Sequence, residues 1–227
     1  MTKKKQDKKA QKKSTTTAEA GADIWFLLDR SGSMASIERD VVAGFDRFFD
    51  EQRQQAGDAT VTIVQFDDAE PHDVLVDAKP LAKVRSIADR FEPRGMTPLY
   101  DAIGRLLDRA ERGKGDAADQ LVVVLTDGME NASHTWTQKQ LFERIGALRA
   151  AGWTFVFLGA NQDSYAAGAG LSMAAGNVSN FRPDSAGTAA AYAGLSRTVS
   201  EWRGKPRDER RRDVDDFWAG QKEAEQV

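Results

Sequence analysis

The sequence predicts an α/β fold: a doubly wound, Rossmann-like and mostly parallel sheet with one antiparallel edge strand and helices on both faces. Two observations support this fold class. Short apolar runs, of the kind that parallel strands buried on both faces show, alternate with longer segments whose apolar residues recur at helical spacing. Strands that alternate with helices are typical of a parallel sheet covered on both sides. A length of 227 residues suits one such domain with flanking tails.

The first strand and helix follow a polar beginning. Ile24–Leu28 is apolar throughout, as a central parallel strand is. Ser36 is a candidate N-cap for the helix that follows. The apolar residues of that helix recur at helical spacing: Ile37, Val41, Phe45, Phe48 and Phe49.

An edge hairpin and two helices come next. Thr60–Phe66 and Asp73–Ala78 are β-rich and flank a turn-prone stretch, so we expect them to pair as the antiparallel edge. Leu81–Arg90 is predicted to be a short helix. Thr97 begins a longer helix, with Pro98 in its first turn.

The second half of the chain repeats the alternation. Leu121–Thr126 and Thr154–Leu158 read as buried strands, and Asn177–Phe181 as a last, short one. Helices are expected over Thr137–Ala150 and around Ala186–Trp202.

We expect three parts along the chain. Residues 1–20 carry seven Lys against two acidic residues and no aromatic residue, which predicts a disordered basic leader. Residues 21–202 are expected to form the folded domain. The net charge of the whole chain is −3, and the domain is acidic while the leader is basic. Residues 203–227 are expected to be a charged tail, mobile or partly helical. Its large apolar residues, Phe217 and Trp218, could dock on the domain or a partner, but we expect a loosely ordered end.

Composition limits the chemistry. The chain has no Cys, and its two imidazoles are His72 and His134, which disfavours zinc sites and His-based catalysis. No stretch approaches the ~20 apolar residues that span a bilayer, and the beginning of the chain has no apolar signal region. We therefore expect a cytoplasmic protein in which any metal is held by oxygen.

Oxygen ligands of this kind follow two predicted strands and begin one predicted helix. Asp29, Ser31 and Ser33 come directly after the first strand, Asp127 follows the strand Leu121–Thr126, and Thr97 begins a helix. Ligands of open α/β sheets bind beyond the carboxyl ends of the strands, and carboxylates and hydroxyls suit a hard cation. The pattern predicts a site for Mg²⁺ or Mn²⁺.

These motifs resemble the von Willebrand factor A domain family, whose metal-ion-dependent adhesion site combines a DxSxS loop, a distant Thr and a distant Asp. The resemblance covers roughly residues 21–200. The phrases Leu-Thr-Asp-Gly-Met-Glu-Asn and Phe-Leu-Gly-Ala-Asn-Gln-Asp look like those of intracellular bacterial and phage members. The resemblance implies that Ser31, Ser33 and Thr97 contact the metal through hydroxyls. It also implies that Asp29 and Asp127 hold the metal directly or through bound water.

Further polar or exposed residues near these motifs have two possible roles each. Those after Asp127 could flank a bound partner or form a solvated loop: Glu130, Asn131, Ser133 and His134. Asn161, Gln162 and Asp163 could shape the rim of the site, or Asp163 could cap a helix. Arg30 and Met34 are expected to face solvent or ligand, and Met96 could be exposed or fill the core.

The function predicted from these features is binding, without catalytic residues. Mg²⁺ or Mn²⁺ would bridge the domain to an Asp or Glu of a protein partner, which could belong to a multiprotein assembly. One alternative is a nucleic-acid-associated protein that uses the basic leader, although nucleic acid and membrane are not the expected partners. A second alternative, a metal-assisted phosphoryl-transfer enzyme, is disfavoured because haloacid-dehalogenase-like phosphatases need an Asp where this chain has Ser31.

Overall fold

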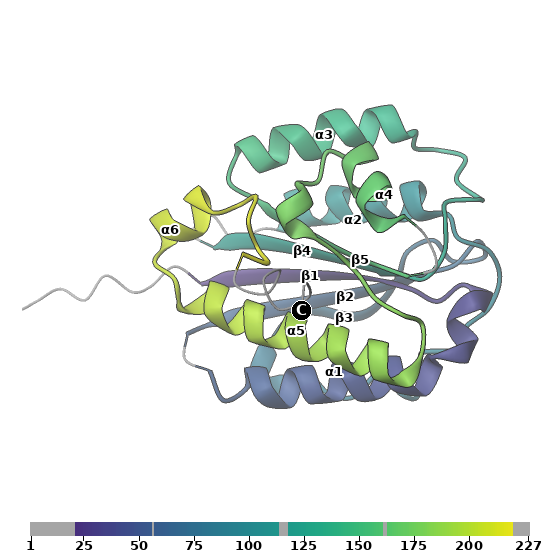
Figure 1. The fold of residues 1–227 in the computed structure, drawn as a ribbon, viewed down its shortest axis with the longest axis horizontal. Helices are drawn as coiled ribbons and strands as arrows, with labels where there is room; N and C mark the ends of the chain where they lie inside the picture. The colour runs from purple at the N-terminus through teal and green to yellow at the C-terminus, as the bar shows by residue number, and fades with distance from the viewer. Residues whose placement is uncertain (1–20, 56, 114–117, 161–162, 220–227) are drawn as a thin grey trace, which may run out of the picture.

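The computed structural model describes residues 21–55, 57–113, 118–160 and 163–219, and in it a six-stranded sheet forms the centre of the molecule (Figure 1). The strands lie in the order β3-β2-β1-β4-β5-β6, and each neighbouring pair is parallel except β2 and β3. Their bounds are β1 Ala22–Asp29, β2 Ala59–Phe66, β3 Asp73–Pro80, β4 Asp119–Thr126, β5 Thr154–Gly159 and β6 Val178–Asn180. The predicted fold class is confirmed, including the antiparallel edge hairpin.

Helices cover both faces of the sheet. α1 and α5 lie on one face, while α2, α3 and α4 lie on the other (Figure 1). The helix bounds are α1 Glu38–Gln52, α2 Leu99–Gly113, α3 Gln138–Ala150, α4 Ser164–Gly170, α5 Ser185–Gly204 and α6 Arg207–Arg212. No range was predicted for the short α4, because its Gly- and Ala-rich segment has little apolar periodicity, although Asp163 was a candidate cap for a helix there.

Alternation along β1 divides the core into two layers. Phe26 faces α1, where its ring meets those of Phe45 and Phe48 edge to face at centroid distances of 5.3 Å. Trp25 and Leu27 point to the opposite face and pack with α2 and α3. Because successive side chains of a strand point to opposite faces, an apolar run such as β1 fills both layers at once.

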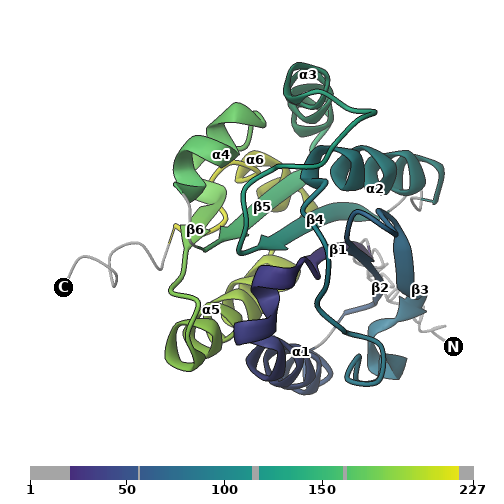
Figure 2. The same cartoon turned by 90° about the vertical axis from the view of Figure 1, so that its right-hand side faces the viewer.

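The strand order creates a crevice at one end of the sheet. The chain runs from β1 outward to β2 and β3, and later from β4 outward to β5 and β6. β1 and β4 are adjacent, so their carboxyl ends form the point at which the winding direction reverses. Ligands of open α/β sheets bind at such points. Figure 2 views the molecule from this end.

Two local predictions were wrong. Leu81–Arg90 is not a helix: a single 3₁₀ turn covers Leu81–Lys83, and Val84 is already extended. The helical spacing there came from side chains that anchor a loop, since Val84, Ile87 and Phe91 are all buried. Ser36 does not cap α1, because it belongs to the 3₁₀ turn Gly32–Ser36 and its hydroxyl donates to a carbonyl of that turn.

The segment after α5 packs on the domain, so the loosely ordered end expected for Phe217 and Trp218 is a further correction. Both aromatic side chains are buried, and the Trp218 backbone N–H donates to the Gly176 carbonyl at 3.0 Å. The Asp119 carboxylate, which is buried at the start of β4, is paired with three arginines of α6, at 3.0, 3.1 and 3.4 Å. The charge run therefore neutralises a buried carboxylate, with Arg210 buried and Arg207 and Arg211 still partly exposed.

Residues 1–20 lie outside the described part of the chain, and the basic leader remains a prediction. Among the residues that the structure describes, no helix is both long and apolar enough to cross a membrane.

Candidate metal centre

Parallel pairing of β1 with β4 brings the two acidic residues of the predicted site to the same end of the sheet. Leu28 is in register with Leu125, so Asp29 and Thr126 are the next neighbours and Asp127 follows directly. The Asp29 carboxylate accepts hydrogen bonds from the Thr126 hydroxyl at 2.6 Å and from the Ser31 backbone N–H at 2.7 Å. Thr126 had no predicted role, because a hydroxyl inside a buried strand gives no sequence signal of its partner.

The two serines of the DxSxS loop join these carboxylates. Ser33 Oγ donates to Asp127 Oδ1 at 2.6 Å, and Ser31 Oγ lies 3.2 Å from Ser33 Oγ. Asp29, Ser31 and Asp127 are almost fully buried. The loop thus places two hydroxyls between two carboxylates.

Thr97 reaches the same place from another loop. A side-chain carbon added to Gly128 would lie 3.1 Å from Thr97 Oγ1 and 3.6 Å from Ser33 Oγ. Both hydroxyls therefore face the Cα of Gly128, which has to be small at this position. Thr97 was predicted to begin the helix, but α2 begins at Leu99 and Thr97 lies just before it. The structure brings all five predicted site residues together.

The electrostatics of the site favour a cation. Burial raises the pKa of Asp29 to about 6; hydrogen bonds from Thr126 and Ser31 oppose the shift, and the charge of Asp127 adds to it. Burial likewise raises the pKa of Asp127, against the hydrogen bond from Ser33. Asp127 Oδ2 is buried and has no hydrogen-bond partner among the described residues. A buried carboxylate oxygen without a partner is costly, and a cation would satisfy it.

The donor set fits a hard divalent ion. Two carboxylates and three hydroxyls supply oxygen alone, the chemistry of Mg²⁺ and Mn²⁺ sites. Within the described residues, no three His, Cys, Asp or Glu side chains gather in a group that could hold a metal. A metal at the ends of β1 and β4 would thus depend on the hydroxyls of Ser31, Ser33 and Thr97.

The loop after Asp127 fixes the position of Thr97. Asn131 Oδ1 accepts from the Thr97 backbone N–H at 2.8 Å, and the Asn131 N–H donates to the Thr97 carbonyl at 3.1 Å. The Glu130 carboxylate accepts from the backbone of Tyr100, Ala132 and Ser133 and from the Ser133 hydroxyl. The side chains of Glu130, Asn131 and Ser133 therefore bond within the protein, while Asn131 and His134 are exposed, as in a solvated loop. A role of these residues beside a partner stays a prediction.

Asp101, at the start of α2, also binds the loop that follows Asp127. Its carboxylate accepts from the backbone N–H groups of His134, Thr135 and Trp136 at 2.7–3.0 Å. Burial opposes ionisation of Asp101, but these three donors outweigh it and lower its pKa. The loop that follows Asp127 is thus tied at several points to the helix that follows Thr97.

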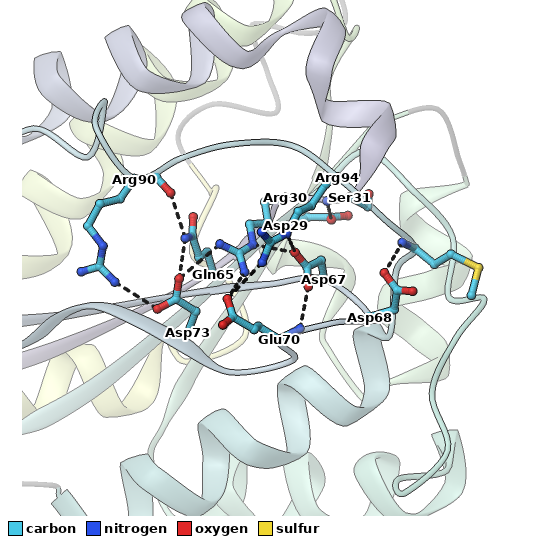
Figure 3. A network of polar contacts seen from close by, with 11 residues as sticks. Asp29, Arg30, Ser31, Gln65, Asp67, Asp68, Glu70, Asp73, Arg90 and Arg94 are labelled. Atoms are coloured by element: carbon cyan, nitrogen blue, oxygen red, sulfur yellow. Dashed lines mark hydrogen bonds and ion pairs between the residues drawn. The ribbon is translucent and has the colours of Figure 1, made fainter.

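An ion-pair network ties the DxSxS loop to its other neighbours (Figure 3). Arg30 was expected to face solvent or ligand, but its side chain is 5% exposed and contacts Asp67, Glu70 and Asp73 at 2.9, 2.7 and 3.2 Å. Met34 is also buried, which corrects the same expectation. The predictions failed because a motif specifies its ligands, whereas the orientation of the side chains between them depends on tertiary partners.

The same network reaches the loop that carries Thr97. Arg94 pairs with Asp67 at 2.7 Å and with Glu70 at 3.1 Å, and its backbone N–H donates to the Arg30 carbonyl at 2.7 Å. Burial opposes ionisation of Asp67, but the bond from Arg94, the Glu70 N–H and the charge of Arg30 lower its pKa. One step along, the Gly32 N–H donates to the carbonyl of Gly95, whose φ of +70° favours glycine. The hydroxyls of the two loops are therefore held in one rigid frame.

The structure describes only part of the segment that follows β5. Asp163 caps α4 by accepting from the Ala166 N–H at 3.0 Å, which confirms the capping alternative. Asn161 and Gln162 lie outside the described residues. Met96 is 49% exposed, so it does not fill the core.

Comparisons with known proteins agree with this geometry. Residues 24–130 match the family model of the von Willebrand factor type A domain. That segment begins at β1 and ends just after Asp127, so it contains all five candidate ligands. No curated protein matches the chain.

Solved structures share the fold at low sequence identity. Proximal thread matrix protein 1 from the mussel byssus, solved with a zinc-occupied MIDAS motif, has a TM-score of 0.61 at 16% identity over 81% of this chain and 46% of that protein. Manganese-loaded TRAP protein of Plasmodium vivax has a TM-score of 0.54 at 16% identity over 75% of this chain and 71% of that one. A von Willebrand factor type A protein from Catenulispora acidiphila has a TM-score of 0.57 at 18% identity over 80% and 43%. The chain thus spans about half the length of the mussel and Catenulispora proteins.

Proposed function

We propose that the chain carries a von Willebrand factor type A domain, whose family model matches residues 24–130, and that it is a metal-dependent protein-binding module. In this proposal Ser31, Ser33 and Thr97 hold Mg²⁺ or Mn²⁺ through their hydroxyls, and Asp29 and Asp127 hold it directly or through bound water. An Asp or Glu of a protein partner completes the coordination.

The observation that carries the proposal is the unpartnered oxygen of Asp127. Asp127 Oδ2 is buried and has no hydrogen-bond partner in the described part of the chain, beside a second buried carboxylate whose pKa is raised to about 6. Two negative charges that burial disfavours are best compensated by a divalent cation. The mussel protein was solved with a zinc-occupied MIDAS motif and the Plasmodium protein was manganese-loaded, and both support a divalent ion in this proposal.

The charge balance favours capture of an anion by the bound metal. Two carboxylates formally neutralise a divalent ion, and neutral hydroxyls contribute less charge than a carboxylate cage would. A cation held in this way attracts a further carboxylate, which is what a partner's Asp or Glu supplies.

Binding is supported over catalysis by the way in which the carboxylates are used. Both oxygens of Asp29 accept hydrogen bonds, from Thr126 and Ser31, and Asp127 Oδ1 accepts one from Ser33. A phosphoryl-transfer reading would need a second Asp at the position of Ser31. These groups are arranged to hold an ion, and we assign no catalytic residue.

Isothermal titration calorimetry with Mg²⁺ and Mn²⁺ tests the metal half of the proposal. Wild type should bind one ion, and Asp29→Asn and Asp127→Asn should bind it at least about tenfold more weakly, since each loses a charged ligand. Asp184→Asn is a matched control, because this carboxylate caps α5 by accepting from the Gly187 N–H, remote in sequence from the candidate ligands. Equal affinity in wild type and both site variants would contradict the assignment.

Affinity capture tests the partner half. Proteins retained by wild type in Mg²⁺ but lost on chelation and lost from Asp127→Asn would be partners of the site. Replacement of the key Asp or Glu of such a partner by Ala should abolish capture. A partner held equally by wild type and by folded Asp127→Asn would use another surface.

A further inference from the structure

Two exposed methionines stand beside the candidate metal centre. Four large apolar side chains of the described residues are exposed: Met96, Met129, Phe142 and Tyr165. Met96 directly precedes Thr97, and Met129 follows Gly128, the neighbour of Asp127. Met129 has the largest exposed fraction of the four, at 68%, and Met96 is 49% exposed. Both are exposed apolar side chains next in sequence to residues of the candidate site, where a binding partner would cover them.

The two methionines belong to loops that are joined to each other. The backbones of Thr97 and Asn131 exchange a hydrogen bond, and the Asn131 side chain accepts a second one from Thr97. A side chain on Gly128 would lie 3.1 Å from Thr97 Oγ1. Each methionine is thus one residue away from a point where the two loops touch.

The backbone at both positions is held in place. The Met96 N–H donates to Asp68 Oδ1 at 2.8 Å, and Gly95 before it bonds to the DxSxS loop. Before Met129, the Gly128 N–H donates to the Thr126 hydroxyl at 3.1 Å, and after it the Glu130 carboxylate accepts four hydrogen bonds. The two methionine side chains are therefore exposed on loops whose backbone is already ordered. Binding of a partner then costs little further backbone entropy.

We propose that Met96 and Met129 form the apolar rim of the binding surface, and that the partner presents an Asp or Glu flanked by apolar side chains. This inference rests on the proposed function, because the metal at the centre is what selects the acidic residue. Around that charge, the partner's apolar side chains would be buried against the methionines. Methionine suits this role, since its flexible, polarizable side chain adapts to differently shaped neighbours.

Two peptides serve as the probes: acetyl-Gly-Leu-Asp-Leu-Gly-amide and acetyl-Gly-Ser-Asp-Ser-Gly-amide. Each is titrated into Mg²⁺-saturated protein labelled with ¹³C at the methionine methyl groups. The chain has five Met residues, so two exposed methyl groups can be compared with those of the buried Met34 and Met173. We expect the Leu-flanked peptide to bind at least about fivefold more tightly than the Ser-flanked one. We also expect its signal changes to be largest at Met96 and Met129.

The matched variants are the double variant Met96→Ser/Met129→Ser and the single variant Phe142→Ser. Phe142 is 47% exposed but lies on α3, outside the two loops. The double variant should keep the Mg²⁺ affinity of wild type by calorimetry and lose the preference for the Leu-flanked peptide. Phe142→Ser should keep the preference.

The outcomes separate this inference from the proposed function. Mg²⁺-dependent binding of both peptides with equal affinity would overturn the apolar rim and leave metal bridging intact. A preference that survives in the double variant would also overturn the rim. Binding of neither peptide, or binding that chelation does not affect, would contradict both the rim and the metal-bridging function on which it rests.

Discussion

Replacement of Arg30 by Met tests whether the network of Figure 3 holds the site together. The guanidinium of Arg30 is 5% exposed and pairs with Asp67, whose side chain is fully buried. Removing one partner of a buried ion pair costs about 3–5 kcal/mol of unfolding free energy, because the other charge stays buried. Asp67 keeps Arg94 and the Glu70 N–H, so we expect a loss near 3 kcal/mol at neutral pH. A domain with about 5–15 kcal/mol of stability remains folded.

The pH dependence of this loss follows from the lowered pKa of Asp67. A carboxyl whose pKa is lower in the folded state stabilises the protein fully above its unfolded pKa of about 4, and that contribution disappears as the pH falls through the folded value. The difference in stability between wild type and Arg30→Met should therefore be complete at neutral pH and shrink in acid. The other charged groups of the network that face Arg30 or Asp67 are Glu70, Asp73 and Arg94.

Urea unfolding followed by circular dichroism, at neutral pH and in acid, measures this difference. The double variant Arg30→Met/Asp67→Asn should be more stable than the sum of the two single changes predicts, by roughly 0.5–3 kcal/mol. Arg47→Met, which breaks a solvent-exposed pair with Glu51, is the control and should change stability little. An Arg30→Met loss no larger than that of Arg47→Met, or one independent of pH, would mean that the Arg30–Asp67 pair does not stabilise the domain.

Three further changes test other parts of the account. Asn131→Ala removes the acceptor that holds the Thr97 backbone N–H, so Mg²⁺ affinity measured by calorimetry should fall while thermal unfolding stays cooperative. Unchanged affinity would mean that the position of Thr97 does not depend on Asn131. Gly44→Ala places a methyl group against the ring of Tyr192 and should cost about 1–3 kcal/mol in urea unfolding, whereas a neutral effect would mean that α1 and α5 adjust freely. Trp218→Ala should cost about 3–5 kcal/mol by the same measurement, and an unaltered midpoint would mean that the end of the chain does not pack on the domain.

The fold was predictable because its strongest signals are local. Strands such as Leu121–Thr126 are apolar on both faces, and such runs indicate central parallel strands wherever they occur. The stretch that contains Val84, Ile87 and Phe91 misled the prediction, because loop residues that anchor separately can imitate helical spacing. Docking of Phe217 and Trp218 was not favoured from the sequence, since their backbone N–H groups bond to Asn177 and Gly176, about 40 positions earlier in the chain.

The sequence predicted which candidate ligands lie close together but not the groups that support them, and their binding of a metal stays a prediction. Asp29, Ser31, Ser33, Thr97 and Asp127 form a motif, and a motif is visible in one sequence. Their supporting groups are ordinary residues whose partners are set by the fold: the Thr126 hydroxyl, the Asn131 amide and the Arg30 network. The partners in these hydrogen bonds lie 34 positions apart for Asn131 and Thr97, and 97 apart for Thr126 and Asp29. No local sequence pattern indicates contacts over such separations.

Anomalous X-ray scattering from crystals grown in Mn²⁺ would show whether the five candidate ligands hold a metal, because it locates the ion without reference to activity or to a partner. We predict one anomalous peak at the carboxyl ends of β1 and β4, within roughly 2–2.5 Å of the hydroxyl oxygens of Ser31, Ser33 and Thr97. Asp29 and Asp127 should ligate it directly or through water. A peak elsewhere, or none at a Mn²⁺ concentration that saturates the protein in solution, would contradict the assignment of these residues as a metal centre.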